Sequence, residues 1–245
     1  MTHKIYDIKD GVKAIVIDVD EKFVKTQIAE NVVSICEGNS ETDIDTIKIK
    51  LKDYLEHKDI RTKRGAIAEF YIHLFLKSLG YKQYCLFLNL EENSIKKGFD
   101  GYYVFNEDEW IVESKSGINS THKSKIKEAY DDLKEKLTTK KKNNPWGNAY
   151  NHAAHVAIGA NKTILAKLKS LSNDYVKNIH LPITEFCLMP CGTVFEHDAS
   201  YDVIKDLIYD EIKSTIDSME YKKICIVGIS NRAYQAFLEF IGLED

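Results

Sequence analysis

The chain has 245 residues, of which 44% are hydrophobic and 29% are charged. This composition supports a folded core and excludes an intrinsically disordered protein, while only 12 glycines and 3 prolines exclude a collagen-like or linker-rich one. The formal net charge of −4 excludes the overall basicity of a protein that simply coats DNA. It leaves open a metal nuclease, because carboxylates gather around the ion in such enzymes.

The cysteines and the N-terminal residues bear on location. The five cysteines are an odd number and most lie in apolar runs, which predicts free, buried thiols in a reducing compartment. No apolar leader segment opens the chain, and no 18 apolar residues run together. We therefore expect a cytoplasmic protein with no membrane partner.

The first part of the chain predicts one strand and two helices. Val12–Val19 is apolar and β-branched, as in a strand, and the residues that follow, up to Cys36, fit a strand or a helix. Thr42–His57 has the apolar spacing of an amphipathic helix. Arg61–Leu79 shows the same spacing more strongly, and Gly80 is placed to end that helix.

Three short strands and a helix are predicted next. The strands are Gln83–Leu90, Phe99–Asn106 and Trp110–Ser114, and the last two are close enough to form a hairpin. Thr121–Leu137 has one apolar face and predicts a helix. A polar, lysine-rich connection over Lys140–Gly147 separates this half from the next.

The second half alternates between strands and helices. Such alternation is typical of an α/β fold, a mixed central sheet flanked by helices. We assign residues 1–58 to an N-terminal elaboration and residues 59–245 to a single domain with a C-terminal α/β extension. The predicted strands are His152–Ala160, Ile183–Met189 and Lys223–Ile229, and the predicted helices are Thr163–Leu171, Tyr201–Met219 and Arg232–Ile241.

Four charged residues form the candidate active centre. Glu113 and Lys115 are two residues apart on a predicted strand, so their side chains project from the same face. Asp100 begins the neighbouring antiparallel strand and can approach that pair across the hairpin. Glu69 lies on the helix predicted to pack beside the sheet and could add a third carboxylate.

This set of groups suits phosphodiester cleavage. The reaction needs a hard cation to neutralise developing charge and to lower the pKa of an attacking water. Mg²⁺ binds oxygen ligands, commonly one or two carboxylates, which Asp100 and Glu113 would supply, with the Ser114 carbonyl as a further ligand. Lys115 would stabilise the charged phosphate and orient or deprotonate the water.

The alternative interpretation is that these are ordinary surface charges at a strand end. An acidic residue two positions before a lysine recurs in the chain, for example at Asp132 and Lys134. Most of these other pairs fall on predicted helices, where a spacing of two does not place side chains on one face. Glu113 and Lys115 differ because they end an apolar strand, with an aspartate one hairpin upstream.

The order of these residues resembles the PD-(D/E)xK nuclease superfamily. Residues 61–160 match the order of its α-β-β-β-α-β, restriction-endonuclease-like core, although Phe99 stands where the family often has proline. The resemblance implies that Asp100 and Glu113 hold Mg²⁺, for which Mn²⁺ can substitute. It also implies that Lys115 is the catalytic lysine, that Glu69 is the helix-borne acid and that DNA is cleaved.

Within that superfamily, the whole chain is similar to the nuclease subunit of the Hachiman anti-phage defence system. The similarity is carried by Arg64–Glu69, the Gly-Phe-Asp-Gly turn, Trp110–Gly117 and the C-terminal α/β extension. It implies a superfamily 2-type helicase partner that recognises phage or damaged DNA and directs the nuclease.

Several residues outside the centre are candidates for nucleic-acid binding. Lys97, Lys123, Lys140 and Lys141 could follow a phosphate backbone, and Trp146 could stack on a base. The alternative is that these lysines are solvated surface charges.

Two other functions stay open: a catalytically silent subunit that binds nucleic acid or a helicase, and a stand-alone restriction endonuclease. The same residues are compatible with DNA or RNA as the substrate and with endonuclease or exonuclease action. They are also compatible with any cut-site sequence and any oligomeric state.

Overall fold

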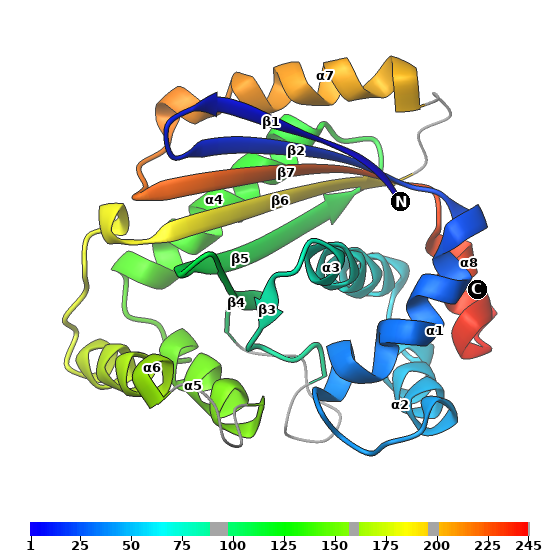
Figure 1. Ribbon diagram of the computed structural model, residues 1–245, viewed down its shortest axis with the longest axis horizontal. Helices are drawn as coiled ribbons and strands as arrows, with labels where there is room; N and C mark the ends of the chain where they lie inside the picture. Colours follow the sequence, from blue (N-terminus) through cyan, green and yellow to red (C-terminus); the bar gives the residue numbers. More distant parts are fainter. Residues whose placement is uncertain (89–97, 157–161, 196–200, 245) are drawn as a thin grey trace.

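The computed structural model describes residues 1–88, 98–156, 162–195 and 201–244. The strands of this part of the chain form one mixed sheet of seven strands in the order β1-β2-β7-β6-β5-β4-β3 (Figure 1). The strands are β1 (Thr2–Lys9), β2 (Val12–Val19), β3 (Lys82–Gln83), β4 (Gly101–Phe105), β5 (Asp108–Gly117), β6 (Cys187–Phe195) and β7 (Lys223–Asn231).

Helices cover both faces of the sheet, which confirms the predicted α/β fold and is compatible with a restriction-endonuclease-like core. Helices α1, α2, α3 and α8 share one hydrophobic cluster with the sheet, and α4, α5, α6 and α7 share the other. No helix within the described ranges is long and apolar enough to cross a membrane. The helices are α1 (Glu21–Glu37), α2 (Ile44–Glu56), α3 (Ile60–Ser78), α4 (His122–Thr138), α5 (Pro145–Val156), α6 (Lys162–Val176), α7 (Tyr201–Lys213) and α8 (Tyr234–Ile241).

The middle of the sheet is parallel, and its strands are buried on both faces. β2 pairs with β7, β7 with β6 and β6 with β5, all in parallel. Such strands carry nearly continuous apolar runs, as in Val12–Val19. The predicted N-terminal elaboration therefore contributes β1 and β2 to the same sheet as the candidate site, together with α1 and α2.

A tight hairpin joins β4 to β5 and sets the register of the candidate site. Asn106 and Glu107 form its two-residue turn with φ angles of 48° and 68°, the left-handed conformation that such turns require. Gly101 pairs with Val112 in this antiparallel hairpin. Asp100, one residue earlier, therefore lies opposite Glu113. The predicted hairpin is confirmed.

Alternation along β5 decides which face each side chain occupies. Trp110 and Val112 belong to the hydrophobic cluster on the α3 side, whereas Ile111 belongs to the cluster on the α4 side. Glu113 and Lys115 continue the face of Ile111, because side chains on a strand alternate.

The two helices that flank β5 begin at side-chain caps. Asp59 accepts a hydrogen bond from the Thr62 N–H (3.0 Å) at the start of α3, and Thr121 accepts one from the Ser124 N–H (3.1 Å) at the start of α4. Such caps satisfy N–H groups that a helix start leaves unpaired. The helices predicted at Arg61–Leu79 and Thr121–Leu137 are confirmed to within one residue at each end.

The strand predicted at His152–Ala160 is wrong as far as the structure describes it. The segment up to Val156 belongs to helix α5, and residues 157–160 lie outside the described ranges. The helix begins at Pro145, which suits a first helical turn, and Asn144 accepts a hydrogen bond from the Gly147 N–H (3.0 Å). These two start signals fall within the segment predicted to be a connection.

Two further differences concern the N-terminal half. The ambiguous segment before Cys36 is the helix α1. The strand predicted at Gln83–Leu90 is reduced to Lys82–Gln83, and residues 89 and 90 lie outside the described ranges. All five cysteines are free and buried, as predicted.

Gly192 on β6 lets helix α4 lie directly against the sheet. A Cβ atom there would be 2.8 Å from Ile126 Cγ1 and 2.9 Å from the backbone oxygen of His122. We predict that Gly192→Ala lowers the free energy of unfolding by about 1–3 kcal/mol, because α4 must shift to relieve the overlap. Urea unfolding measures the change.

Gly65 provides the matched control within helix α3. A Cβ atom there would meet nothing within 4 Å, so Gly65→Ala should leave stability unchanged or raise it by roughly 0.5–1 kcal/mol. Equal effects of the two substitutions would contradict the tight packing of α4 on β6.

Candidate active site

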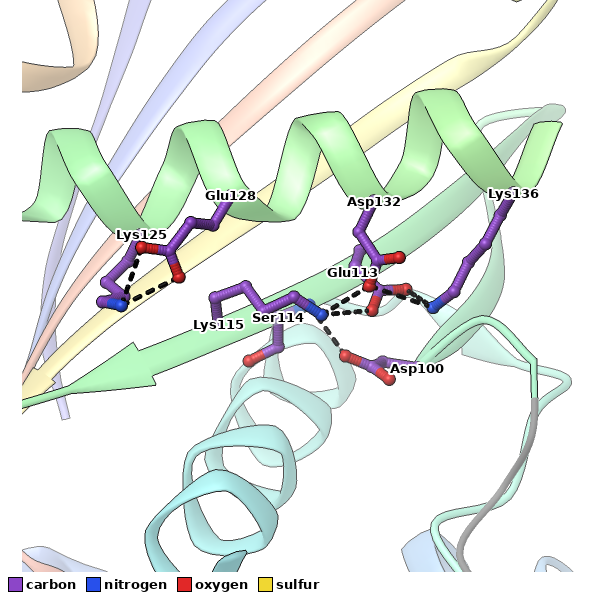
Figure 2. Close-up of polar contacts among 8 residues, drawn as sticks. All are labelled: Asp100, Glu113, Ser114, Lys115, Lys125, Glu128, Asp132 and Lys136. Atoms are coloured by element: carbon purple, nitrogen blue, oxygen red, sulfur yellow. Dashed lines mark hydrogen bonds and ion pairs between the residues drawn. The ribbon is translucent and has the colours of Figure 1, made fainter. Parts of the chain in front are cut away.

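Glu113 is the most buried charged group of the predicted centre. Its residue is 1% exposed, and two ammonium groups hold its carboxylate from different elements. Lys115 on β5 donates to Oε1 (3.0 Å), and Lys136 on α4 donates to Oε2 (2.6 Å) (Figure 2). The contact with Lys115 confirms that these two side chains share one face of the strand.

The electrostatic environment of Glu113 disfavours its charge. Burial raises its pKa, the negative charge of Asp100 raises it further, and Lys136 and Lys115 offset part of this effect, leaving a pKa of about 8. A cation placed beside the carboxylate would reverse the shift, because opposite charge favours the ionised form.

Asp100 reaches the same centre from the entry to β4. Its Oδ2 accepts a hydrogen bond from the Ser114 N–H (2.8 Å), so the carboxylate is held against the backbone of β5. The predicted approach of Asp100 across the hairpin is confirmed. Ser114 points its side chain to the opposite face from Glu113, toward α3 (Figure 2).

Asp132 and Lys136 complete the centre, and the sequence did not single them out. Both lie on α4, four residues apart, and Asp132 Oδ2 contacts the ammonium of Lys115 (2.5 Å) and that of Lys136 (3.4 Å). Burial raises the pKa of Asp132, but hydrogen bonding with Glu113 and Lys115 and the charge of Lys136 outweigh it, giving a pKa of about 2.

The carboxylates keep both lysines charged. Burial lowers the pKa of Lys115, but Glu113, Asp132 and Asp100 together raise it above its ordinary value. The same balance of burial against neighbouring carboxylates raises the pKa of Lys136. Five groups, three carboxylates and two ammoniums, thus form one interlinked cluster.

Two cavities border this cluster, one on each side of β5. The cavity on the α3 side has a volume of about 240 Å³ and includes Glu69 and Ser114 in its lining. The cavity on the α4 side has a volume of about 520 Å³ and includes Glu113. Asp100 and Lys115 line both cavities.

Glu69 lines the α3-side cavity, whereas Glu113 lines the α4-side cavity. Glu69 lies on α3, which packs on the face of β5 opposite to the Glu113 side chain, and its Oε1 is 3.5 Å from Nε2 of His73. The prediction that Glu69 adds a third carboxylate to the centre stays a prediction, because Glu69 lines a cavity that Asp100 and Lys115 also line. Asp100, Glu113 and Lys115 are brought together, and Glu69 lines the adjoining cavity.

The donor set fits a hard divalent cation bound by few protein ligands. Among the described residues, no group of three or more His, Cys, Asp or Glu side chains is arranged to hold a metal ion. The carboxylates of Asp100 and Glu113 are the kind of pair through which Mg²⁺ binds, with water and phosphate oxygens as its other ligands.

The predicted nucleic-acid-binding lysines occupy different places. Lys97 lies outside the described residues. Lys123, near the start of α4, is exposed, and Lys140 donates to the backbone oxygen of Val176 (2.6 Å). Lys141 pairs with Glu135 and lines the α4-side cavity, so it is the one of these four that the structure places beside the centre.

The predicted base-stacking role of Trp146 is contradicted by its burial. The residue is 3% exposed. It packs edge-on against Phe99, with ring centroids 4.9 Å apart, and at a tilt against Phe186, with centroids 5.4 Å apart. An indole in the core cannot present its face to a base. The lysine-rich sequence before it suggested a surface, but Trp146 is at the buried start of helix α5.

Comparison with protein families gives one match that spans nearly the whole chain. The family model described as HamA matches residues 3–241. The chain belongs to the HamA family. HamA proteins are subunits of the Hachiman anti-phage defence system, so the family confirms the defence role expected from the resemblance. A search of curated proteins finds no match for this HamA-family chain.

The structure predicts a purely structural role for Trp146 in this HamA-family chain. We expect Trp146→Ala to lower the free energy of unfolding by about 3–5 kcal/mol, as for other large-to-small core substitutions, and Trp146→Phe to lower it by less. Chemical denaturation tests both. Full stability together with weakened binding to single-stranded oligonucleotides would instead support base stacking.

Proposed function

We propose that this HamA-family chain is a metal-dependent nuclease that cleaves DNA phosphodiester bonds. The observation that carries the proposal is the contact of Glu113 with Lys115 in the lining of a cavity that Asp100 also lines. A catalytically silent subunit would have no need of buried, mutually repelling carboxylates at the edge of a cavity, since such groups destabilise a fold unless they are compensated.

Asp100 and Glu113 would hold Mg²⁺, or Mn²⁺ in its place, with the Ser114 carbonyl as a further ligand. The ion supplies Lewis-acid chemistry: it lowers the pKa of a water molecule and neutralises charge on the phosphate. The charges of the cluster are consistent with this role. With all five groups ionised, as a bound dication would favour, three carboxylates and two ammoniums carry one net negative charge, and the dication reverses its sign to suit a phosphodiester.

Lys115 is the residue of this cluster placed to act on the reacting phosphate. Its ammonium lies between the Glu113 and Asp132 carboxylates and lines both cavities. Held there, it can donate hydrogen bonds to a phosphate oxygen and orient the attacking water. Asp132 positions it from α4.

The α4-side cavity is suited to the phosphates next to the cleaved bond. Lys136, Lys141 and Lys142 line it together with Asn143 and Tyr175. Lysines along one groove provide sequence-independent attraction for a nucleic-acid backbone. An acidic protein can in this way bind DNA through a local basic surface.

A partner would determine when this site is used. We propose a superfamily 2-type helicase subunit as that partner, in keeping with the Hachiman defence role, and a free chain with weak activity. An unrestrained nuclease would damage the DNA of its own cell.

Substitutions at the centre test catalysis. We expect Glu113→Gln and Lys115→Met to reduce Mg²⁺-dependent cleavage by about 100-fold or more, the usual loss when a group that stabilises transition-state charge is removed. Plasmid nicking by the chain with and without its helicase partner measures the rate, with linear duplex, single-stranded DNA and RNA as parallel substrates.

Lys134→Met is the matched control, because Lys134 is on α4 but pairs with Glu220 on the surface (3.0 Å). It should cleave at the wild-type rate. Absence of Mg²⁺- or Mn²⁺-dependent cleavage of every substrate by the wild type, alone and with its partner, would support a silent binding subunit. Discrete, site-specific fragments from the isolated chain would support a stand-alone restriction endonuclease.

The lysines that line the α4-side cavity predict how DNA binding depends on salt concentration. We expect the double substitution of Lys141 and Lys142 by Ala to reduce the slope of log Kd against log salt by about 1 to 2. DNA binding with fewer lysine–phosphate contacts releases fewer counterions, and the slope follows that number. Fluorescence anisotropy with a labelled duplex in EDTA measures the slope without cleavage. Ala substitutions at Lys134 and Lys205 are the control and should leave the slope unchanged.

A further inference from the structure

Lys136 holds one of the two oxygens through which the Glu113 carboxylate could bind a divalent cation. Lys115 takes Oε1 of the carboxylate, and Lys136 takes Oε2 at 2.6 Å (Figure 2). A buried carboxylate has few directions from which ligands can approach. An ammonium held at one oxygen therefore competes with a metal ion for that oxygen, because the two positive charges repel each other at such short range.

This contact differs from an ordinary surface ion pair. The side chains of Lys136 and Glu113 are 22% and 2% exposed, whereas those of Lys134 and Glu220, also joined from α4, are 48% and 61% exposed. Solvent and salt weaken exposed pairs far more than buried ones. The Lys136 contact is thus able to compete with other cations.

We propose that Lys136 is a positioning residue that serves as the internal counter-ion of Glu113 and gives way when a divalent cation binds. The proposal rests on the metal-dependent function proposed above and assigns to Lys136 a role in setting metal affinity. In the metal-free protein, its ammonium compensates the buried charge. With a dication bound, that compensation is redundant, and the ammonium is released from Oε2.

Asp132 determines where the released ammonium goes. Its Oδ2 is 3.4 Å from Lys136 Nζ and lies on the same helix. Lys136 can therefore leave Glu113 without leaving the α4-side cavity, which it lines. A positive charge held there meets the phosphate backbone of a bound nucleic acid, so release by the metal ion prepares the cavity for substrate.

The test is Mn²⁺ binding measured by titration calorimetry on the full chain without nucleic acid, so that no catalytic step enters. We expect Lys136→Met to bind Mn²⁺ about tenfold more tightly than the wild type, which corresponds to the loss of a competing ion pair of about 1.4 kcal/mol. Lys136→Gln, which keeps a hydrogen-bonding side chain, should show the same direction of change.

Two controls isolate the effect. Lys136→Arg keeps the positive charge and should bind Mn²⁺ within about twofold of the wild type, and Lys134→Met should match the wild type. Thermal unfolding without metal shows whether each variant is folded. We expect Lys136→Met to have a lower Tm than the wild type without metal. Added Mn²⁺ should raise the Tm of Lys136→Met by more than it raises that of the wild type.

The outcomes separate this inference from the proposed function. A wild type that binds Mn²⁺ and cleaves DNA, with folded Met and Gln variants that bind Mn²⁺ equally or more weakly, overturns the role of Lys136 alone. A wild type that neither binds Mn²⁺ nor cleaves any nucleic acid overturns both.

Discussion

The buried carboxylate of Glu113 is the constraint around which the site is arranged. An ionised carboxylate that is 1% exposed is destabilising unless opposite charges and hydrogen bonds compensate it. The compensation comes from Lys115 on the same strand and from Lys136 on α4. The docking of α4 on β5 is therefore an electrostatic requirement of the site as well as a matter of apolar packing.

The backbone geometry serves the same cluster. The two-residue turn at Asn106 and Glu107 sets the pairing of Gly101 with Val112, and that pairing brings Asp100 level with Glu113. Gly101 lets the Tyr103 ring lie against the strand backbone, since a Cβ atom there would be 2.6 Å from that ring. A one-residue slip in this hairpin would turn the β5 side chains to the other face.

The part of the site that could be predicted was the part governed by local periodicity. Glu113, Lys115 and Asp100 lie on neighbouring strands, where spacing alone fixes the face. Asp132 and Lys136 could not be assigned in the same way. Their partners on β5, Lys115 and Glu113, are 17 and 23 positions away, and any polar residue beside the apolar stripe of a helix fits solvent equally well. Helix α5 differs from the predicted strand for a related reason. Its short apolar segment fits a strand or a helix, and the asparagine and proline at its start are equally typical of a connecting loop.

The charged cluster around Glu113 is better explained by the proposed reaction chemistry than by a contribution to the stability of the fold. Replacing a buried ion pair with apolar side chains of similar size is often neutral or stabilising, so an α4–β5 contact made of leucine and valine would serve the fold at least as well. What apolar side chains cannot provide is a carboxylate pair for a dication and ammoniums for a phosphate. The arrangement of Glu113, Asp132 and the two lysines is the one that the proposed nuclease chemistry would need. Their mutual pairing compensates the buried charges of the cluster.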